Sequence, residues 1–167
     1  MLKVIHVLDS FDRDAVGAAG PAADAASWTV PDVVGLVAEW AEETPAAPAA
    51  TDALAEVLGD AADTSSVPSW LVRLTAETVG RPWGNGTGWV GLHVLAVADA
   101  PTAGGLSVFR PEEAADPSGW ELTLHLPVED DRLFVFRRSM GCAWTGAQPG
   151  DGSALLARAF LIPETAA

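Results

Sequence analysis

Three carboxylates lie close together after an apolar run near the start of the chain: Asp9, Asp12 and Asp14 in HVLDSFDRD. Carboxylate oxygens are the ligands that a hard cation such as magnesium prefers. The spacing lacks the glycine and the closing glutamate of a calcium loop, and Arg13 can pair with its neighbours. A solvated turn is the alternative to a metal site. We predict no bound metal or other cofactor, with these three residues as the metal candidates.

The three histidines lie in segments with strand-like patterns, and their spacing is not that of a metal site. His125 alternates onto the same polar face as Glu121 and Thr123, where the trio could act as general acid or base in a cleft. An ordinary exposed strand face is the alternative. His93 lies within an apolar run, which predicts a core histidine with a satisfied hydrogen bond.

Cys142 is the only cysteine, so the chain can form no intramolecular disulfide. Paired with His6, His93 or His125, it could serve as a nucleophile. Lone buried cysteines are also common core residues without reactivity, and the GCAW context does not favour the nucleophile.

Two large rings, Trp83 and Trp89, flank the flexible turn GNGTG at residues 84–88. Tryptophan is favoured at binding sites, so the pair could rim a binding loop, although it could equally pack in the core at element ends. No Lys-Ser/Thr pair follows the glycines, which excludes a phosphate-binding loop of the common type.

The elements that must position these residues change character near Trp83. The pattern of residues 2–8 (LKVIHVL) predicts a strand. Residues 9–26 predict a long connection that can hold a helical turn. Residues 29–80 have mostly helical spacing and predict a helical layer, whereas residues 88–162 alternate and predict a mainly antiparallel sheet.

Three short helices are expected within that layer. The first begins at a Thr29 cap, places Val33, Leu36, Val37 and Trp40 on one side, and ends near Glu43. The second runs from Thr51 to Gly59, and the third from Ser66 to Gly80.

Within the sheet we expect five or so strands. The main candidates are residues 89–98, 106–109, 120–126 and 133–137. Residues 140–144 and 155–162 are further candidates, with a helix as the alternative for the last segment. The run 89–98 is apolar on both faces, which indicates a central strand. The segment Trp120–Arg137 predicts a hairpin that turns at Glu129–Asp131. The fold class is therefore α+β, with an antiparallel sheet of about five strands and three short helices packed on one face.

A one-signed block of charge marks the helical half. Between Arg13 and Arg73 there is no lysine or arginine, but there are ten carboxylates: Asp14, Asp24, Asp32, Glu39, Glu42, Glu43, Asp52, Glu56, Asp60 and Asp63. Glu39, Glu42 and Glu43 would crowd the last turn of the first helix, where negative charge is unfavourable. They therefore predict an interaction surface for a basic partner, while genome bias and simple solubility are the alternative explanation.

The net charge of −14 argues against binding to nucleic acid or to an anionic membrane. No apolar run approaches the roughly 20 residues that span a bilayer, and the acidic N-terminal segment is unlike a signal peptide. A chain of 167 residues fits one globular domain, residues 1–167, with a cytoplasmic location as the default.

Two classes of function remain. The first is an acidic accessory protein whose acidic helical layer or open sheet face docks a protein partner in a chaperone-like or neutralising role. Its candidate binding residues are Glu39, Glu42, Glu43, Trp83 and Trp89. The second is a small enzyme or small-molecule-binding protein with a cleft between sheet and helices, using carboxylates and a histidine. We favour the first. The sequence leaves the formation of a homo-oligomer open.

Overall fold

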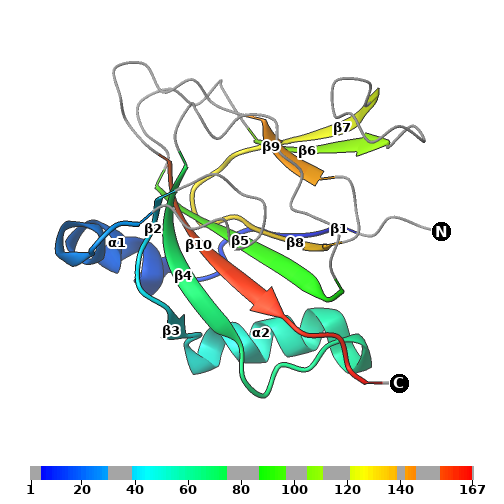
Figure 1. Ribbon diagram of the computed structural model, residues 1–167, viewed down its shortest axis with the longest axis horizontal. Coiled ribbons are helices and arrows are strands. Elements are labelled where there is room, and N and C mark those ends of the chain that lie inside the picture. Colours follow the sequence, from blue (N-terminus) through cyan, green and yellow to red (C-terminus); the bar gives the residue numbers. More distant parts are fainter. Residues whose placement is uncertain are drawn as a thin grey trace.

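A computed structural model describes residues 5–29, 39–74, 87–96, 105–110, 121–138, 142–145 and 155–166. Two antiparallel sheets hold the strands of these residues (Figure 1). The larger has the order β1-β8-β5-β10-β4-β2, with β3 also pairing with β4, and the smaller has the order β7-β6-β9. The strands are β1 (Ile5–Leu8), β2 (Glu39–Trp40), β3 (Thr44–Pro45), β4 (Pro68–Leu74), β5 (Trp89–Ala96), β6 (Gly105–Arg110), β7 (Glu121–Pro127), β8 (Leu133–Arg137), β9 (Cys142–Thr145) and β10 (Leu155–Ile162).

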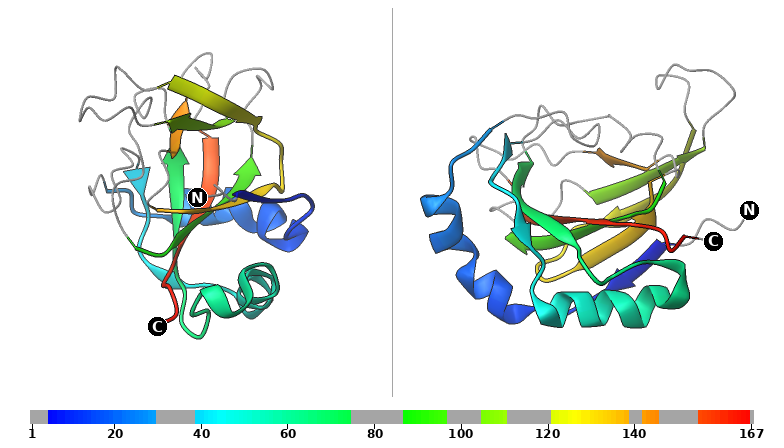
Figure 2. Two further views of the ribbon diagram at one scale, coloured as in Figure 1. Left: turned by 90° about the vertical axis from the view of Figure 1, so that its right-hand side faces the viewer. Right: turned by 60° about the horizontal axis from the view of Figure 1, so that its bottom comes forward.

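The two helices, α1 (Arg13–Ala25) and α2 (Pro48–Leu58), cover one face of the larger sheet, and a 3-10 turn (Gly59–Ala61) follows α2. The three-stranded sheet lies toward the opposite face, as two further views show (Figure 2). Between the sheets lies an apolar core, which Leu126 and Val128 complete from the side of β7. Its buried members are Trp40, Val72, Val90, Leu92, Val94, Phe134, Phe136, Ala157 and Ala159.

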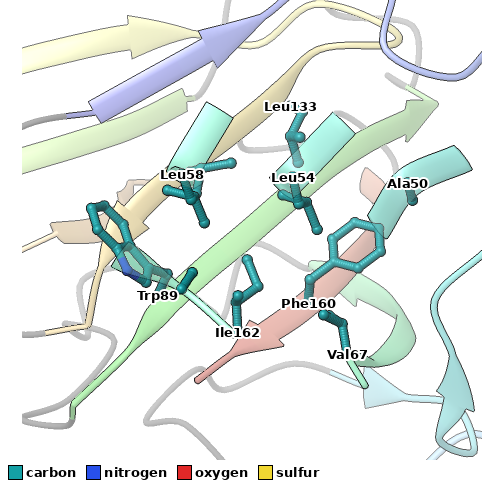
Figure 3. Close-up of a cluster of buried hydrophobic side chains, with 10 residues drawn as sticks. Ala50, Leu54, Leu58, Val67, Trp89, Leu133, Phe160 and Ile162 are labelled. Atoms are coloured by element: carbon teal, nitrogen blue, oxygen red, sulfur yellow. The ribbon is translucent and has the colours of Figure 1, made fainter. Parts of the chain in front are cut away.

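A second core lies between α2 and the larger sheet (Figure 3). The helix directs Ala50, Leu54 and Leu58 at the sheet, a spacing of four residues that keeps them on one side. They pack against residues such as Phe160 and Ile162 of β10. The helix ends at Gly59, whose φ of 54° suits glycine. The predicted helix at 51–59 is therefore confirmed, with an earlier start.

The helix α1 occupies most of the predicted connection at residues 9–26. Asp12 caps it, because its carboxylate accepts a hydrogen bond from the backbone N–H of Ala15 at 3.0 Å. Gly17, Gly20 and Pro21 made the segment look non-helical by sequence. Packing of its alanines against apolar residues of the sheet, such as Leu95, outweighs that weak propensity.

Among the described residues of the predicted helical layer at 29–80, the prediction is wrong for the segments around β2 and β4. The segment predicted as the third helix contains β4, and Glu39 and Trp40, predicted in the first helix, form β2. In β4, Leu71 packs on the helix side while Val72 packs between the sheets. A strand that buries both faces has no period of two, so its apolar residues matched a helical spacing by chance. Residues 30–38 and 75–80 lie outside the described residues.

The predicted hairpin across Trp120–Arg137 is also wrong. A turn is present at Asp130–Asp131, as expected, but it joins the two sheets. The strand β7 pairs with β6, whereas β8 pairs with β1 and β5. Adjacent strands of the chain pair often but not always, and here each strand finds its partner elsewhere.

The remaining strand predictions are confirmed in position. The strand β5 is central, as expected, with β8 and β10 as its neighbours. A single domain stays a prediction. In the described part of the chain, no helix is long and apolar enough to cross a membrane, and the cytoplasmic location stays a prediction too.

Candidate functional site

A pocket lies between the N-terminal ends of both helices and strands β5 and β10, on the helix-covered face of the larger sheet. Its volume is about 420 Å³, within the usual range for small-molecule sites. We call it the helix–sheet pocket. Its walls are Phe11, Asp12, Asp14, Ala15, Ala18, Thr44, Pro45, Ala47, Ala50, His93, Arg158 and Phe160.

His93 stands at the sheet side of this pocket and is 1% exposed. Its Nε2 lies 2.9 Å from Oδ1 of Asp131, and the ring of Phe11 meets the imidazole edge-on, with 4.9 Å between the ring centroids. Burial lowers the pKa of His93 from its ordinary value, and the neighbouring Asp131 acts in the opposite direction. The imidazole is therefore mainly neutral at pH 7, with the proton on Nε2 donated to Asp131.

Asp131, in the turn before β8, forms hydrogen bonds with β5 and with the start of α1. Its Oδ1 also accepts the backbone N–H of Asp12 at 2.7 Å, and its own N–H donates to the carbonyl of Val94 at 2.9 Å. Its backbone has a φ of 60°, a left-handed conformation that aspartate tolerates better than most residues. Its Oδ2 is buried and has no hydrogen-bond partner among the described residues. The carboxylate thus holds His93 in one orientation at the pocket wall.

Arg158 is the cross-strand neighbour of His93 on β10 and lines the same pocket. Its Nη1 makes only long contacts, 3.3 Å to Oγ1 of Thr44 and 3.4 Å to Oγ of Ser69. Burial lowers the pKa of Arg158, and the charge of Asp12 acts in the opposite direction. Within the described ranges, no carboxylate oxygen lies within 4.0 Å of this guanidinium.

Three other arginines of the described residues form ion pairs, whereas Arg13 and Arg138 do not. Arg73 contacts Glu39 at 2.8 Å, Arg132 contacts Asp9 at 2.6 Å, and Arg137 pairs with Glu164. Arg158 is partly buried and forms no ion pair with the acids that the structure describes, so its guanidinium is a group that a ligand can contact. The pocket can therefore bind an anionic group at Arg158 and offers a neutral, oriented imidazole beside it.

The structure separates the three candidate metal ligands. Asp9 forms the ion pair with Arg132, Asp12 caps α1, and Asp14 is exposed at the rim of the pocket. Among the described side chains, no group of three or more His, Cys, Asp or Glu residues could hold a metal ion.

Glu39, Glu42 and Glu43 do not lie at a helix end. Glu39 lies in β2 and pairs with Arg73, while Glu42 and Glu43 are exposed in the link between β2 and β3. Trp89 is 5% exposed and packs in the core under α2. Trp83 lies outside the described residues.

The candidates for acid–base and nucleophilic chemistry lie in the three-stranded sheet. His125 pairs with Ser107 and Glu121 with Arg110, both across the β7–β6 ladder. Cys142 pairs with Val108 from the other side of β6, so its strand is two strand spacings, roughly 10 Å, from that of His125. Their roles stay predictions.

Sequence reasoning missed Asp131 and Arg158 and took His93 only as a core residue. His93 is indeed buried and hydrogen-bonded as expected. One local signal was present for Arg158: it is the only charged residue in the apolar run LLARAFLI. A charge in a buried strand needs a partner or a ligand. Asp131 was read as a turn residue, and no local signal connects it to a histidine on another strand.

No protein-family model and no curated protein matches the sequence. Solved structures do match the fold. One is HygX from Streptomyces hygroscopicus with nickel, 2-oxoglutarate and hygromycin B bound, at a TM-score of 0.61 and 13% identity, over 98% of this chain and 84% of that one. Another is a prolyl-4-hydroxylase from Pseudomonas putida, at a TM-score of 0.54 and 14% identity, over 96% and 93%. The chain therefore has the jelly-roll, or double-stranded β-helix, fold of these proteins.

The metal chemistry that such a fold implies can be tested against the residues present. Oxygenases with non-haem iron bind their metal with two histidines and a carboxylate. This chain has three histidines, and they lie on β1, β5 and β7. His93 is engaged with Asp131, and His125 lies in the other sheet from His6 and His93. Inside the sandwich the described core is apolar, so the residues that the structure describes do not fit such a metal centre.

The interpretation of the chain as an acidic accessory protein that docks a protein partner is wrong. The chain instead shares its fold with HygX and with the prolyl-4-hydroxylase. The predicted acidic helix end is absent, since Glu39 lies in a strand and is paired with Arg73. The alternative, a cleft between helices and sheet with carboxylates and a histidine, agrees better with the structure, although the histidine at the pocket is His93 rather than His125.

Proposed function

We propose that this chain is a small-molecule-binding protein of an enzyme-type fold, and that its ligand binds in the helix–sheet pocket. The observation that carries the proposal is that one cavity of about 420 Å³ is lined by His93, which is buried and paired with Asp131, and by Arg158, which forms no ion pair with a carboxylate of the described residues. Functional sites are where burial and charge are arranged to shift pKa values, as they are for both His93 and Arg158.

The geometry supports two roles for the protein's own residues. Arg158 binds and orients a polar group of the ligand. His93 contacts Asp131 through Nε2, so Nδ1 is the ring nitrogen left to act as a proton acceptor. An imidazole oriented by a carboxylate is a common general base.

The test is a thermal-shift screen of a library of small metabolite-like molecules against three proteins: the wild type, Ala18→Trp and Gly17→Trp. Ala18 is exposed and lines the pocket, so tryptophan there should fill it. Gly17 is its neighbour on α1, also exposed, and a side chain there meets nothing within 4 Å. Gly17→Trp is therefore the matched control.

We expect ligands that raise the Tm of the wild type and of Gly17→Trp but not of Ala18→Trp. A ligand at 100 times its Kd adds about 2.7 kcal/mol, which corresponds to roughly 5–10 °C for a domain of this size. A screen without hits on the wild type, or hits that persist in Ala18→Trp, would overturn the proposal.

A further inference from the structure

We infer that the ligand of the helix–sheet pocket is a small apolar monocarboxylic acid whose carboxylate binds Arg158, an inference that rests on the proposed function. The site lies on the helix-covered face of the larger sheet, between α1, α2 and β10, and not in the space between the two sheets.

The guanidinium of Arg158 has donors that the described residues leave poorly satisfied. A guanidinium has five N–H donors in a planar fork that matches a carboxylate. Here it is partly buried, and its contacts are two neutral hydroxyl oxygens at 3.3 and 3.4 Å, close to the limit of a hydrogen bond. The charge of Asp12 acts on Arg158, but no carboxylate oxygen of the described residues lies within 4.0 Å of the guanidinium. A partly buried charge without a direct ion pair is costly, so an anion in contact with it would be stabilised. Ser69 in turn donates to the carbonyl of Thr44 at 3.0 Å, which holds these two oxygens in place.

The N-terminus of α2 lines the same pocket as Arg158. Ala47, the N-cap of α2, and Ala50 both line the pocket. Unlike α1, which Asp12 caps, α2 has no side-chain cap and no acidic residue in its first turn. A helix N-terminus carries partial positive charge. It therefore adds to Arg158 in favouring negative charge on the α2 side of the pocket.

The other walls of the pocket favour an anion with a single charge and an apolar body. Asp12 and Asp14 line the opposite wall, and the chain carries a net charge of −14. Both disfavour a dianion such as phosphate. The rest of the wall is mainly apolar, with Phe11 and Phe160 as its large members. A single carboxylate on an apolar body satisfies the arginine without meeting the acidic wall.

The experiment measures binding of phenylacetate and hexanoate by calorimetry, with neutral phenylacetamide and inorganic phosphate for comparison. The proteins are the wild type, Arg158→Met, Arg158→Lys and the control Arg73→Met. Arg73 pairs with Glu39 and does not line the pocket, so its variant tests for a general loss of positive charge. Circular dichroism and the Tm of each variant check folding. Arg158→Lys keeps the charge should Arg158→Met fail to fold.

We expect at least one of the two acids to bind the wild type and Arg73→Met, with affinity lowered at least about tenfold by Arg158→Met and by an intermediate factor by Arg158→Lys. Equal binding of the amide, retention of affinity in Arg158→Met, binding of neither acid, or a preference for phosphate would overturn the inference. A neutral ligand that Ala18→Trp excludes would overturn it while the proposed function stands.

Discussion

The carboxylate of Asp131 lies 2.9 Å from Nε2 of His93, although 38 residues separate them along the chain. The contact joins the turn before β8 to the middle of β5, and the backbone of Asp12 joins it at the same oxygen. One buried carboxylate therefore sets both the orientation of the histidine and the entry into α1. The wall of the helix–sheet pocket depends on this oxygen.

Removing the Asp131 carboxylate should destabilise the protein. Asp131→Ala leaves the Nε2–H of His93 and the backbone N–H of Asp12 without an acceptor, so we expect the free energy of unfolding to fall by about 2–4 kcal/mol. Asp131→Asn keeps an oxygen acceptor and tolerates the left-handed backbone, so its cost should be roughly 1 kcal/mol. Urea unfolding of both variants measures the difference. Equal losses would show that the hydrogen bonds contribute little.

Stability should decrease as the pH falls below about 6.5. Burial is the largest influence on His93 and lowers its pKa, so the unfolded chain takes up a proton at a higher pH than the folded protein. The contribution of His93 to the free energy of unfolding is fully present above the pKa of His93 in the unfolded chain. It is lost as the pH falls toward the pKa of His93 in the folded protein, by at most about 1.4 kcal/mol per pH unit. Urea unfolding between pH 5 and 7.5 should show this slope, and His93→Gln should flatten it. An unchanged slope in the variant would assign the effect to other groups.

Replacing Gly88 and Gly17 by alanine should change the free energy of unfolding in opposite directions. Gly88 has a φ of 91°, and a Cβ there would lie 2.6 Å from the carbonyl oxygen of Ile162, so Gly88→Ala should cost about 1–3 kcal/mol. Gly17 lies in α1, where a Cβ meets nothing within 4 Å, so Gly17→Ala should add roughly 0.5–1 kcal/mol. Chemical denaturation measures both. A destabilised Gly17→Ala would show that α1 tolerates less than its open surroundings indicate.

Addition of Ni²⁺ or Fe²⁺, with or without 2-oxoglutarate, should leave the Tm unchanged. HygX, which shares the fold, has nickel and 2-oxoglutarate bound in its structure, so these are the ligands to test. Among the side chains that the structure describes, no set of ligands for such a metal exists, and the three histidines lie on three strands of two sheets. A saturable rise in Tm at one equivalent of metal would contradict the prediction.

The elements that were predicted correctly are those whose sequence pattern comes from the segment itself. The helix α2 has its apolar residues on one side and a glycine at its end, and β7 follows an alternating pattern. The run that forms β5 is apolar on both faces because it lies between β8 and β10 and under both cores. Each of these patterns belongs to the segment itself, whatever its partners are.

Elements whose pattern is set by their neighbours were predicted wrongly. The strand β4 buries Leu71 on one face and Val72 on the other, which hides its period, and α1 contains Pro21 and two glycines yet is held by its packing on the sheet. The strands β7 and β8 follow one another along the chain but pair in different sheets. Such pairings follow from the burial of whole faces, a property that no single segment carries.

By itself, the sequence determined an α+β chain with a mainly antiparallel second half, a helix at residues 51–58 and a buried, hydrogen-bonded His93. Only the tertiary structure decided that Asp131 is its partner, that Arg158 lies beside it across the β5–β10 ladder, and that the N-terminal ends of two helices close a pocket over both. The reason is physical: periodicity and caps act within about a turn or two of chain, whereas the charge balance of a pocket depends on segments that only the packing of the sheet brings together.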